Sequence, residues 1–363
     1  MQVCFRVDAS RTAGHGHVMR CLSLAQELRK RGARVSFVSR EHPGNLCGLI
    51  EERGFAVSRL SEPAPDMVFE DTPVHAAWLG ASWQEDARQT MAVLDGTTEK
   101  PDWLVVDHYA LDVRWESALS RVVGKILVID DLADRRHEAQ VLLDQNLYPD
   151  MGQRYVGLLS SGCRALLGPS FALLRREFVE ARANTSPRNA GVRKIFVFFG
   201  GSDLNNETER ALASIAALRK PDVSVDVVVG AGNSRYEAIK DICTSMRGMR
   251  LHCQIDNMAQ LMSEADLSLG AGGSTTWERC ALGLPALVIS VADNQIAIAD
   301  GVDKAGAHRH LGLSKDVTVT QLTAAIEEIA SGPKLLEKMS RSASALADGK
   351  GCERVVKIME EFA

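Results

Sequence analysis

The sequence predicts an α/β fold made of two doubly wound, Rossmann-like domains that face each other across a cleft. Three observations support this prediction. Continuous apolar, β-branched runs alternate with segments of helical periodicity, glycine-rich turns follow several of these runs, and the alternation starts again after a polar segment in the middle of the chain. Because strands covered by helices on both faces read as continuous apolar runs, we expect parallel sheets.

The composition is that of a globular protein with room for two hydrophobic cores: 363 residues, 45% hydrophobic and 25% charged. A formal net charge of -5 gives no reason to expect nucleic acid or an anionic membrane surface as a partner. The amino-terminus shows no signal-peptide pattern, and no apolar run approaches the ~20 residues of a membrane helix, so we expect a cytoplasmic protein without membrane insertion. Eight cysteines without a Cys-x-x-Cys pair favour free thiols over disulfides or a zinc site.

The first half opens with a strand over residues 3–7 and then a helix over residues 18–28, where apolar side chains recur at helical spacing. Ser82 stands three residues before Glu85, a capping-box spacing that predicts the start of a helix running to about residue 94. A further helix is expected near residues 46–53. Apolar runs predict the other strands of this half, at 34–39, 102–107, 125–129 and 141–143.

Residues 184–191 are polar and rich in turn formers, which predicts a linker between two domains. We place the N-terminal domain at residues 1–183, the C-terminal domain at 192–345, and a C-terminal helix at 346–363 that packs back on the N-terminal domain. Apolar runs predict the strands of the second half at 194–199, 223–229, 267–269 and 286–290. One helix is expected to follow the 200–203 turn and to end at about residue 218. Further helices are expected at 277–282 and in the tail from Thr320.

The turn from Gly14 to His17 joins the first strand to the first helix, a place where α/β folds bind ligands. Met19 replaces the third glycine of a dinucleotide fingerprint, and no Walker ending follows. No set of His, Cys or Asp at ligand spacing accompanies His15 and His17, so no metal site is expected. Because imidazole titrates near neutrality, His17 is a candidate general base; the alternative is a structural histidine. His15 receives no role.

The segment 270–276 is the best candidate for an anion site. Its glycines expose backbone N–H groups, and Ser274 and Thr275 add hydroxyls where a helix begins, so phosphate could be held without a lysine. Glu278, one turn into that helix, could bind the two hydroxyls of a ribose. The alternative is a tight turn with an ordinary helix cap.

Other strand ends offer weaker candidates. Gly201 and Ser202 could line the cleft, whereas Asp203 and Asn205 are equally well explained as helix caps. His108 and Tyr109 follow another strand and could meet the same cleft, or form a strand cap with a buried phenol. Neighbouring side chains in an extended segment point apart, so capping is expected for the pair 130–131 rather than acid chemistry.

Several motifs occur together in a definite order. They are Arg6-Val7-Asp8-Ala9-Ser10, Gly14-x-Gly16-His17-x-x-Arg20, Val106-Asp107-His108-Tyr109, Ile129-Asp130-Asp131-Leu132-Ala133, Gly168-Pro169-x-Phe171-Ala172-Leu173-Leu174-Arg175, Phe199-Gly200-Gly201-Ser202-Asp203 and Gly272-Gly273-Ser274-Thr275-Thr276-Trp277-Glu278. From residue 3 to beyond residue 295 the chain resembles the UDP-sugar hydrolases of pseudaminic acid biosynthesis (the PseG type). The second half also resembles the UDP-GlcNAc transferase of peptidoglycan synthesis.

The resemblance implies a glycosyltransferase-B-like fold and hydrolysis of UDP-2,4-diacetamido-2,4,6-trideoxy-β-L-altropyranose to UDP and the free sugar. His17 corresponds to the proposed base, and Tyr109 to a tyrosine beside the sugar. The expected substrate-binding residues are Gly14, Gly16 and Arg20 in the matched N-terminal motif, Gly201 and Ser202, Ile255 for uracil, Glu278 for ribose, and Gly272, Gly273, Ser274 and Thr275 for the diphosphate.

The expected mechanism is attack of water on the anomeric carbon, with C–O cleavage and inversion, and it needs no cofactor or divalent metal. Asn294 and Gln295 could bind the amides of the sugar, with helix capping as the alternative. Two other functions stay open: an inverting glycosyltransferase that uses a UDP-amino-sugar donor, and a nucleotide-sugar binding module without chemistry. We expect a monomer whose only partner is the small-molecule UDP-sugar.

Overall fold

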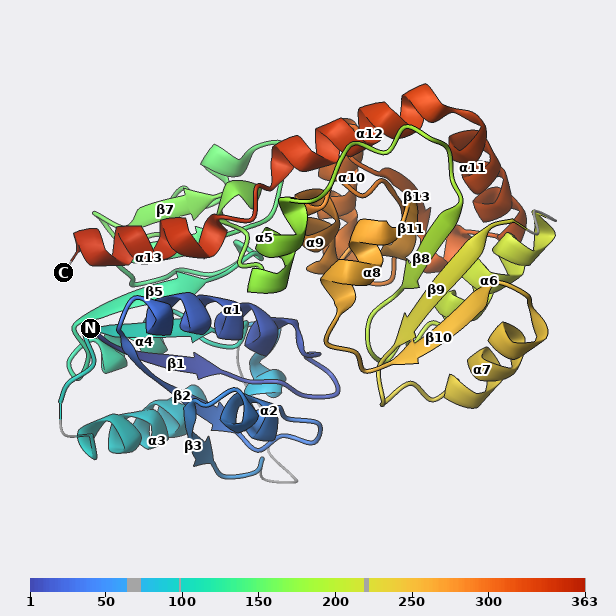
Figure 1. Cartoon of the computed structure of the whole chain (residues 1–363). Helices are drawn as coiled ribbons and strands as arrows, with labels where there is room; N and C mark the ends of the chain where they lie inside the picture. Colours follow the sequence, from blue (N-terminus) through green and yellow to red (C-terminus); the bar gives the residue numbers. More distant parts are fainter. Residues whose placement is uncertain (64–72, 98, 219–221, 363) are drawn as a thin grey trace. The chain divides into compact units, whose positions relative to one another are not determined.

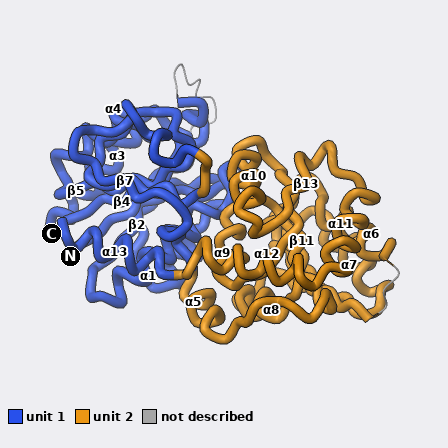
Figure 2. Tube along the Cα trace, turned by 90° about the horizontal axis from the view of Figure 1, so that it is seen from above, with its two compact units in different colours: residues 1–146, 150–174, 350–363 blue, residues 147–149, 175–349 orange. Residues whose placement is uncertain are grey.

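The computed structural model describes residues 1–63, 73–97, 99–218 and 222–362 (Figure 1). The chain forms two compact units, which Figure 2 shows in separate colours. Unit 1 consists of residues 1–146, 150–174 and 350–363, and unit 2 consists of residues 147–149 and 175–349. No helix within these described ranges is long and apolar enough to cross a membrane.

Unit 1 is built on a parallel sheet of seven strands in the order β3-β2-β1-β4-β5-β6-β7. The strands are β1 (Gln2–Val7), β2 (Arg34–Arg40), β3 (Ala56–Leu60), β4 (Trp103–Asp107), β5 (Lys125–Ile129), β6 (Val141–Asp144) and β7 (Arg164–Leu167). The helices are α1 (Gly16–Lys30), α2 (Cys47–Glu52), α3 (Trp83–Asp95), α4 (Val113–Leu119) and α13 (Gly351–Glu361), with 3-10 turns η1 (Ala76–Leu79), η2 (Met151–Gln153) and η3 (Pro169–Phe171).

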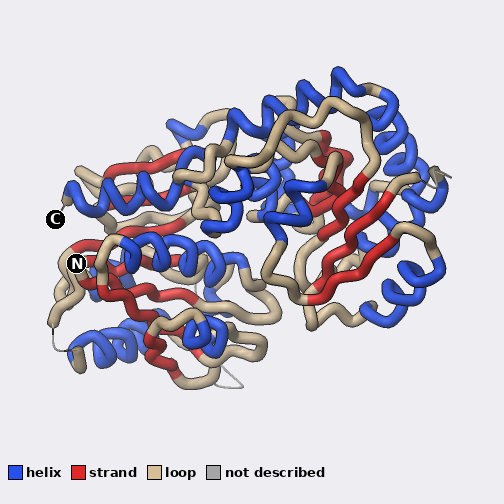
Figure 3. The backbone as a smooth tube through the Cα atoms, in the orientation of Figure 1, coloured by secondary structure: helices blue, strands red, loops and turns tan. Residues whose placement is uncertain are grey.

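Helices cover both faces of this sheet, as Figure 3 shows. Phe5 of β1 packs in a cluster with α1 and α13, whereas its neighbour Cys4 packs in the cluster that holds α3 and α4. Successive side chains of a strand point to opposite faces, so a strand covered on both sides is apolar at every position. Ser82 caps α3 by accepting a hydrogen bond from the Glu85 amide at 3.2 Å, as its spacing predicts.

Unit 2 repeats the architecture with a parallel sheet of six strands in the order β10-β9-β8-β11-β12-β13. The strands are β8 (Lys194–Phe198), β9 (Ser224–Val229), β10 (Met249–Cys253), β11 (Leu267–Ala271), β12 (Ala286–Ser290) and β13 (Arg309–Leu313). The helices are α5 (Arg176–Arg182), α6 (Glu207–Ala217), α7 (Tyr236–Ser245), α8 (Met258–Glu264), α9 (Thr275–Ala281), α10 (Ile296–Lys304), α11 (Val319–Ser331) and α12 (Pro333–Leu346), with 3-10 turns η4 (Asp293–Gln295) and η5 (Ser314–Asp316).

The boundary between the units lies at residues 174 and 175, not at the expected 183 and 184. The polar segment 184–191 belongs to unit 2, because Arg188 is buried there and donates hydrogen bonds to main-chain carbonyls, among them those of Ala265, Ser263 and Leu282. The carboxyl ends of two helices therefore hold a segment whose composition alone is that of a free linker.

Candidate functional site

In unit 1 the first turn of α1 points a histidine and an arginine at the end of β4. Gly14 has a φ of 78°, which favours glycine, and a side chain added there would meet no atom within 4 Å. His17 and Arg20 stand three residues apart and therefore share one face of the helix. Both contact Asp107, the last residue of β4, so the turn, the helix and the strand end form one site.

Asp107 fixes the orientation of His17. One carboxylate oxygen lies 2.6 Å from His17 Nδ1, and Arg20 donates to both oxygens, at 2.6 and 2.7 Å. Burial by itself raises the pKa of Asp107, but the charge of Arg20 and the hydrogen bonds from Arg20 and His17 outweigh it and hold that pKa well below its usual value. An ionised carboxylate only accepts hydrogen bonds, so Nδ1 carries the proton and Nε2 of a neutral His17 is the basic atom.

Tyr109 and Asp131 complete the network. The Tyr109 hydroxyl donates to one oxygen of Asp131 at 2.5 Å, and Arg20 and Asn146 donate to the other oxygen at 3.1 Å each. The Tyr109 ring meets the His17 ring edge to face, with centroids 4.6 Å apart. Burial raises the pKa of Tyr109 well above its usual value, and nearby Asp131 adds to this, so the phenol stays protonated.

The structure gives Arg20, Asp130 and Asp131 separate roles that the sequence alone does not reveal. Arg20 is 7% exposed and its guanidinium is engaged by Asp107 and Asp131, so it organises the two carboxylates of the site. Asp130 is a cap, as expected, because it accepts from the Ala133 amide at 2.9 Å and pairs with Arg135. Asp131, its neighbour, points the other way and belongs to the site.

Two aromatic residues that the sequence analysis does not single out lie beside Tyr109. The His75 and Trp78 rings are 4.4 Å apart between centroids, and they stand 5.5 and 5.9 Å from the Tyr109 ring. Both are half-buried and come from the short η1 region, which has no periodicity to mark it. Burial lowers the pKa of His75, although Asp134 opposes the shift, so His75 stays neutral at pH 7. The rings of His17, Tyr109, His75 and Trp78 together form an aromatic wall.

In unit 2 hydrogen bonds to the Gln295 side chain hold the glycine-rich turn between β11 and α9 in place. The Gln295 side-chain oxygen accepts from the amides of Gly272 and Val291, at 3.2 and 3.1 Å, and so ties this turn to the end of β12. Its amide nitrogen lies 3.9 Å from the place where a side chain at Gly273 would begin. Ser274 is exposed and makes no capping hydrogen bond, Thr275 is half-buried, and Asn294 is exposed.

Glu278 lies on the same helix and pairs with Arg175 at 3.1 Å. Arg175 also pairs with Glu177 at 2.5 Å and lies over the Phe178 ring, so it is fixed from two sides. Arg175 is the last residue of the motif that begins at Gly168. Its ion pair with Glu278 places the end of that motif beside the residue expected to bind ribose. Ile255 is half-buried in the turn between β10 and α8, against the cluster that holds Phe178.

The turn after β8 approaches the turn after β9. Gly230 donates to the Gly201 carbonyl at 2.9 Å, and a side chain at Gly230 would collide with the Gly201 backbone. Ser202 is exposed. Asp203 is a helix cap, because its carboxylate accepts from the amides of Glu207 and Thr208 at 3.0 and 2.8 Å. The capping alternative is thus the right one for Asp203.

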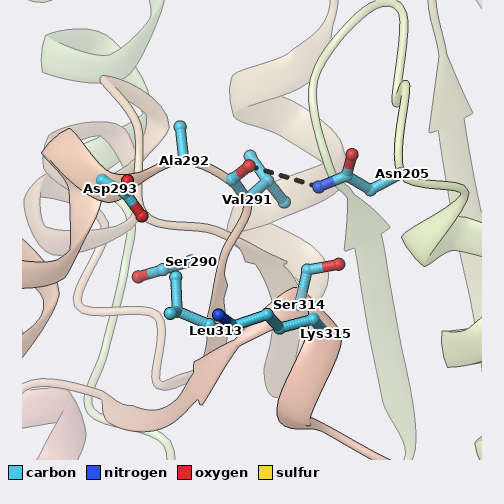
Figure 4. Close-up of a pocket in the computed structure, with 8 residues that line it drawn as sticks. All are labelled: Asn205, Ser290, Val291, Ala292, Asp293, Leu313, Ser314 and Lys315. Carbon is cyan, nitrogen blue, oxygen red and sulfur yellow. Dashed lines mark hydrogen bonds between the residues drawn. The ribbon is translucent and has the colours of Figure 1, made fainter.

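A cavity of about 420 Å³ lies at the carboxyl ends of β12 and β13 (Figure 4). Its wall includes the Asn205 side chain, whose amide donates to the Val291 carbonyl at 3.2 Å. The other lining residues are Ser290, Ala292, Asp293, Leu313, Ser314 and Lys315. The cavity adjoins the 293–295 turn and does not include the residues expected to hold the diphosphate.

The expected site residues are divided between the two units: Gly14, Gly16, His17, Arg20 and Tyr109 in unit 1, and Gly201, Ser202, Ile255, Gly272, Gly273, Ser274, Thr275, Glu278, Asn294 and Gln295 in unit 2. Across the described part of the chain, no three His, Cys, Asp or Glu side chains are grouped so as to hold a metal ion. All eight cysteines are free thiols, and six are buried.

Comparison with known proteins agrees with this architecture. A crystal structure of MurG from Acinetobacter baumannii superimposes with a TM-score of 0.67 and 16% identity, covering 99% of each chain. The chain has the GT-B fold. Residues 195–355, which include most of unit 2, match the glycosyltransferase family 28 C-terminal domain.

Several relatives match both halves of the chain. An uncharacterized protein of Methanocaldococcus jannaschii is 23% identical over 322 residues, which are 87% of this chain; the chain spans 61% of that protein. The UDP-2,4-diacetamido-2,4,6-trideoxy-β-L-altropyranose hydrolase of Campylobacter jejuni is 27% identical over 308 residues, which cover 84% of this chain and 97% of that enzyme.

Proposed function

We propose that this protein hydrolyses a UDP-sugar, with His17 as the general base. The observation that carries the proposal is the Asp107–His17 pair, at 2.6 Å, which holds Nδ1 as a donor and leaves Nε2 free to accept a proton. In general-base catalysis a carboxylate orients the histidine that takes the proton. Nucleotide binding alone does not require this arrangement. The similarity to the Campylobacter jejuni hydrolase supports UDP-2,4-diacetamido-2,4,6-trideoxy-β-L-altropyranose as the substrate.

In this proposal unit 2 binds the UDP part. The Ile255 backbone contacts uracil and Glu278 binds the ribose hydroxyls, while the turn with Gly272, Gly273, Ser274 and Thr275 holds the diphosphate. Backbone N–H groups of the turn stabilise the negative charge that grows on the leaving UDP. Gln295 supports the proposal by keeping this turn in place: its side-chain oxygen accepts from the Gly272 amide, which is therefore not one of the N–H groups that meet the diphosphate.

The residues of unit 1 act on the sugar and the water. Nε2 of His17 takes a proton from the water as its oxygen bonds to the anomeric carbon, and the bond from that carbon to the UDP oxygen breaks with its electron pair. The attack comes from the face opposite UDP, so the configuration inverts. Asp107 stabilises the imidazolium that forms, and Gly14 and Gly16 leave room for the sugar and the water.

The direct test is to incubate the protein with UDP-2,4-diacetamido-2,4,6-trideoxy-β-L-altropyranose in ¹⁸O-water and to follow the label by mass spectrometry. We expect one ¹⁸O atom in the free sugar and none in UDP, because the water attacks carbon. Label in the phosphate would mean attack at phosphorus and would overturn the mechanism.

A second candidate function is favoured by the family 28 C-terminal domain, which matches residues 195–355. In an inverting glycosyltransferase, His17 would activate an acceptor hydroxyl instead of water. UDP release in the absence of any acceptor supports the hydrolase, and a strict acceptor requirement supports the transferase. A binding module without chemistry would bind UDP and form no product from the sugar nucleotide.

Trp78 should contribute to binding of the sugar. The proposed sugar carries a methyl group and two acetamido groups, whose apolar parts can pack against the aromatic wall of His17, His75, Trp78 and Tyr109. An aromatic contact contributes about 0.5–1.5 kcal/mol beyond area burial, so Trp78→Ala should raise KM roughly 2- to 10-fold with little change in kcat.

The matched control for Trp78→Ala is Trp78→Phe, which keeps a ring and should restore most of the KM. The affinity for UDP, which lacks the sugar, should be unchanged in both variants. An unchanged KM in Trp78→Ala, or an equal weakening of UDP binding, would remove Trp78 from the sugar site.

A further inference from the structure

Arg279 carries a buried positive charge directly under the turn between β11 and α9. The residue is 2% exposed, and its Nη2 atom donates to the Ala271 carbonyl at 2.9 Å and to the Thr276 hydroxyl at 3.0 Å. Its Nη1 atom lies 2.7 Å from the place where a side chain at Gly270 would begin, so the guanidinium occupies that space. Among the described residues, no carboxylate lies within ion-pair distance of Arg279.

A buried guanidinium without a counter-charge is costly, because burial removes its hydration and the two hydrogen bonds to neutral groups do not balance its charge. Arginine also keeps its proton: burial lowers the pKa of Arg279 to about 10, which still leaves it charged at neutral pH. Glu278, the acid next to it in the chain, is already paired with Arg175. The folded chain therefore holds a positive charge here that its own residues do not neutralise.

Arg188, a second buried arginine of unit 2 without a carboxylate partner at ion-pair distance among the described residues, shows how the fold compensates a structural arginine. Its guanidinium donates to four main-chain carbonyls, including those of Met262, Ser263 and Ala265 where α8 ends. Carbonyls at a helix carboxyl end carry partial negative charge, so they compensate the cation. Arg279 has one carbonyl and one hydroxyl, both from the turn and first residues of α9.

We infer that Arg279 is a positioning residue for an anionic ligand: its charge, fixed under the 270–275 turn, is neutralised by the diphosphate of the bound nucleotide. The inference rests on the proposed function for the place of the diphosphate, but it does not depend on hydrolysis. It accounts for how a turn without a lysine, at a helix of only seven residues, attracts a strongly charged group. Glycine at position 270 leaves room for the guanidinium, and the Phe198 carbonyl, also 2.7 Å from the place where a side chain would begin, excludes a side chain there as well.

The test compares Arg279→Met with the matched control Arg188→Met, measuring the dissociation constants of UDP and uridine by calorimetry and the melting temperature without ligand. Arg279→Met should weaken UDP binding on the order of 10- to 100-fold and leave uridine binding within about 2-fold, because uridine carries no phosphate. Its ligand-free melting temperature should stay level or rise. Arg188→Met should lower the melting temperature and keep the preference for UDP over uridine.

Two further variants keep the outcome decisive. Arg279→Lys keeps the charge and should recover part of the UDP affinity, whereas Arg279→Gln keeps hydrogen bonding without the charge and should behave like Arg279→Met. Equal losses for UDP and uridine, or a lower melting temperature with unchanged UDP affinity, would overturn the inference. Binding is measured without turnover, so a failure of the ¹⁸O experiment would leave this result standing, and the reverse also holds.

Discussion

Replacing His17 with asparagine should lower kcat for the UDP-sugar about 10²- to 10⁴-fold, the usual contribution of a general base. Asparagine cannot accept a proton from water, but it can keep a polar contact with Asp107, which lies 2.6 Å from His17 Nδ1. UDP binding should be unchanged, because the residues proposed to bind UDP all belong to unit 2. Steady-state release of UDP and calorimetric UDP binding measure the two quantities.

His15 offers a matched control for this substitution, because it lies in the same turn, is exposed, and makes no capping hydrogen bond. His15→Asn should keep kcat within about 3-fold of the unsubstituted protein, as surface substitutions usually have small effects. Near-normal turnover in His17→Asn would rule out the base assignment. A large loss of UDP affinity would instead show that His17 belongs to the nucleotide site.

Replacing Asp107 with asparagine should also lower kcat strongly, on the order of 10²- to 10⁴-fold, although Asp107 touches neither sugar nor water in the proposal. The neutral amide no longer selects the tautomer with a proton on Nδ1, and it no longer stabilises the imidazolium. If Asp107 acts through His17, the double variant His17→Asn/Asp107→Asn should be no slower than His17→Asn alone. Additive losses in the double variant would show that Asp107 has a separate role.

Asp107 also pairs with Arg20, so its loss weakens the fold, and a control must separate that effect from catalysis. Glu116 and His137 form a buried carboxylate–histidine pair of the same kind, at 2.7 Å in unit 1, without any proposed part in the chemistry. Glu116→Gln should lower the melting temperature and leave kcat of the folded enzyme within about 3-fold. A comparable loss of kcat in Glu116→Gln would mean that general destabilisation explains both results.

The candidate site is only partly predictable from the sequence. The glycine turn and His17 stand out because a strand, a glycine turn and a helix follow one another within a few residues. Asp107 and Asp131 lie 87 and 111 residues from Arg20 in the chain, and only the parallel sheet brings their strand ends together. Without that sheet nothing distinguishes Asp131 from its capping neighbour Asp130. The sequence likewise contains no pattern that identifies His75 and Trp78 as residues of the site.

The sequence by itself determines the interior of both sheets. Each interior strand is covered by helices on both faces, so it has to be apolar at successive positions, and that pattern is legible without a structure. The four strands that sequence patterns do not predict, β3, β7, β10 and β13, are the sheet edges. Edge strands alternate or carry polar residues because part of their surface meets solvent, so only pairing with a formed neighbour makes them strands.

Tertiary structure also decides where the boundary between the units lies and which buried charges are compensated by neighbouring groups. The 184–191 segment has the composition of a linker, but Arg188 secures it to helix carboxyl ends within unit 2. Arg188 and Arg279 are chemically identical in the sequence, yet one is compensated by carbonyls and the other is not. Burial makes that difference matter, because a charge removed from water depends entirely on the partners that the fold places around it.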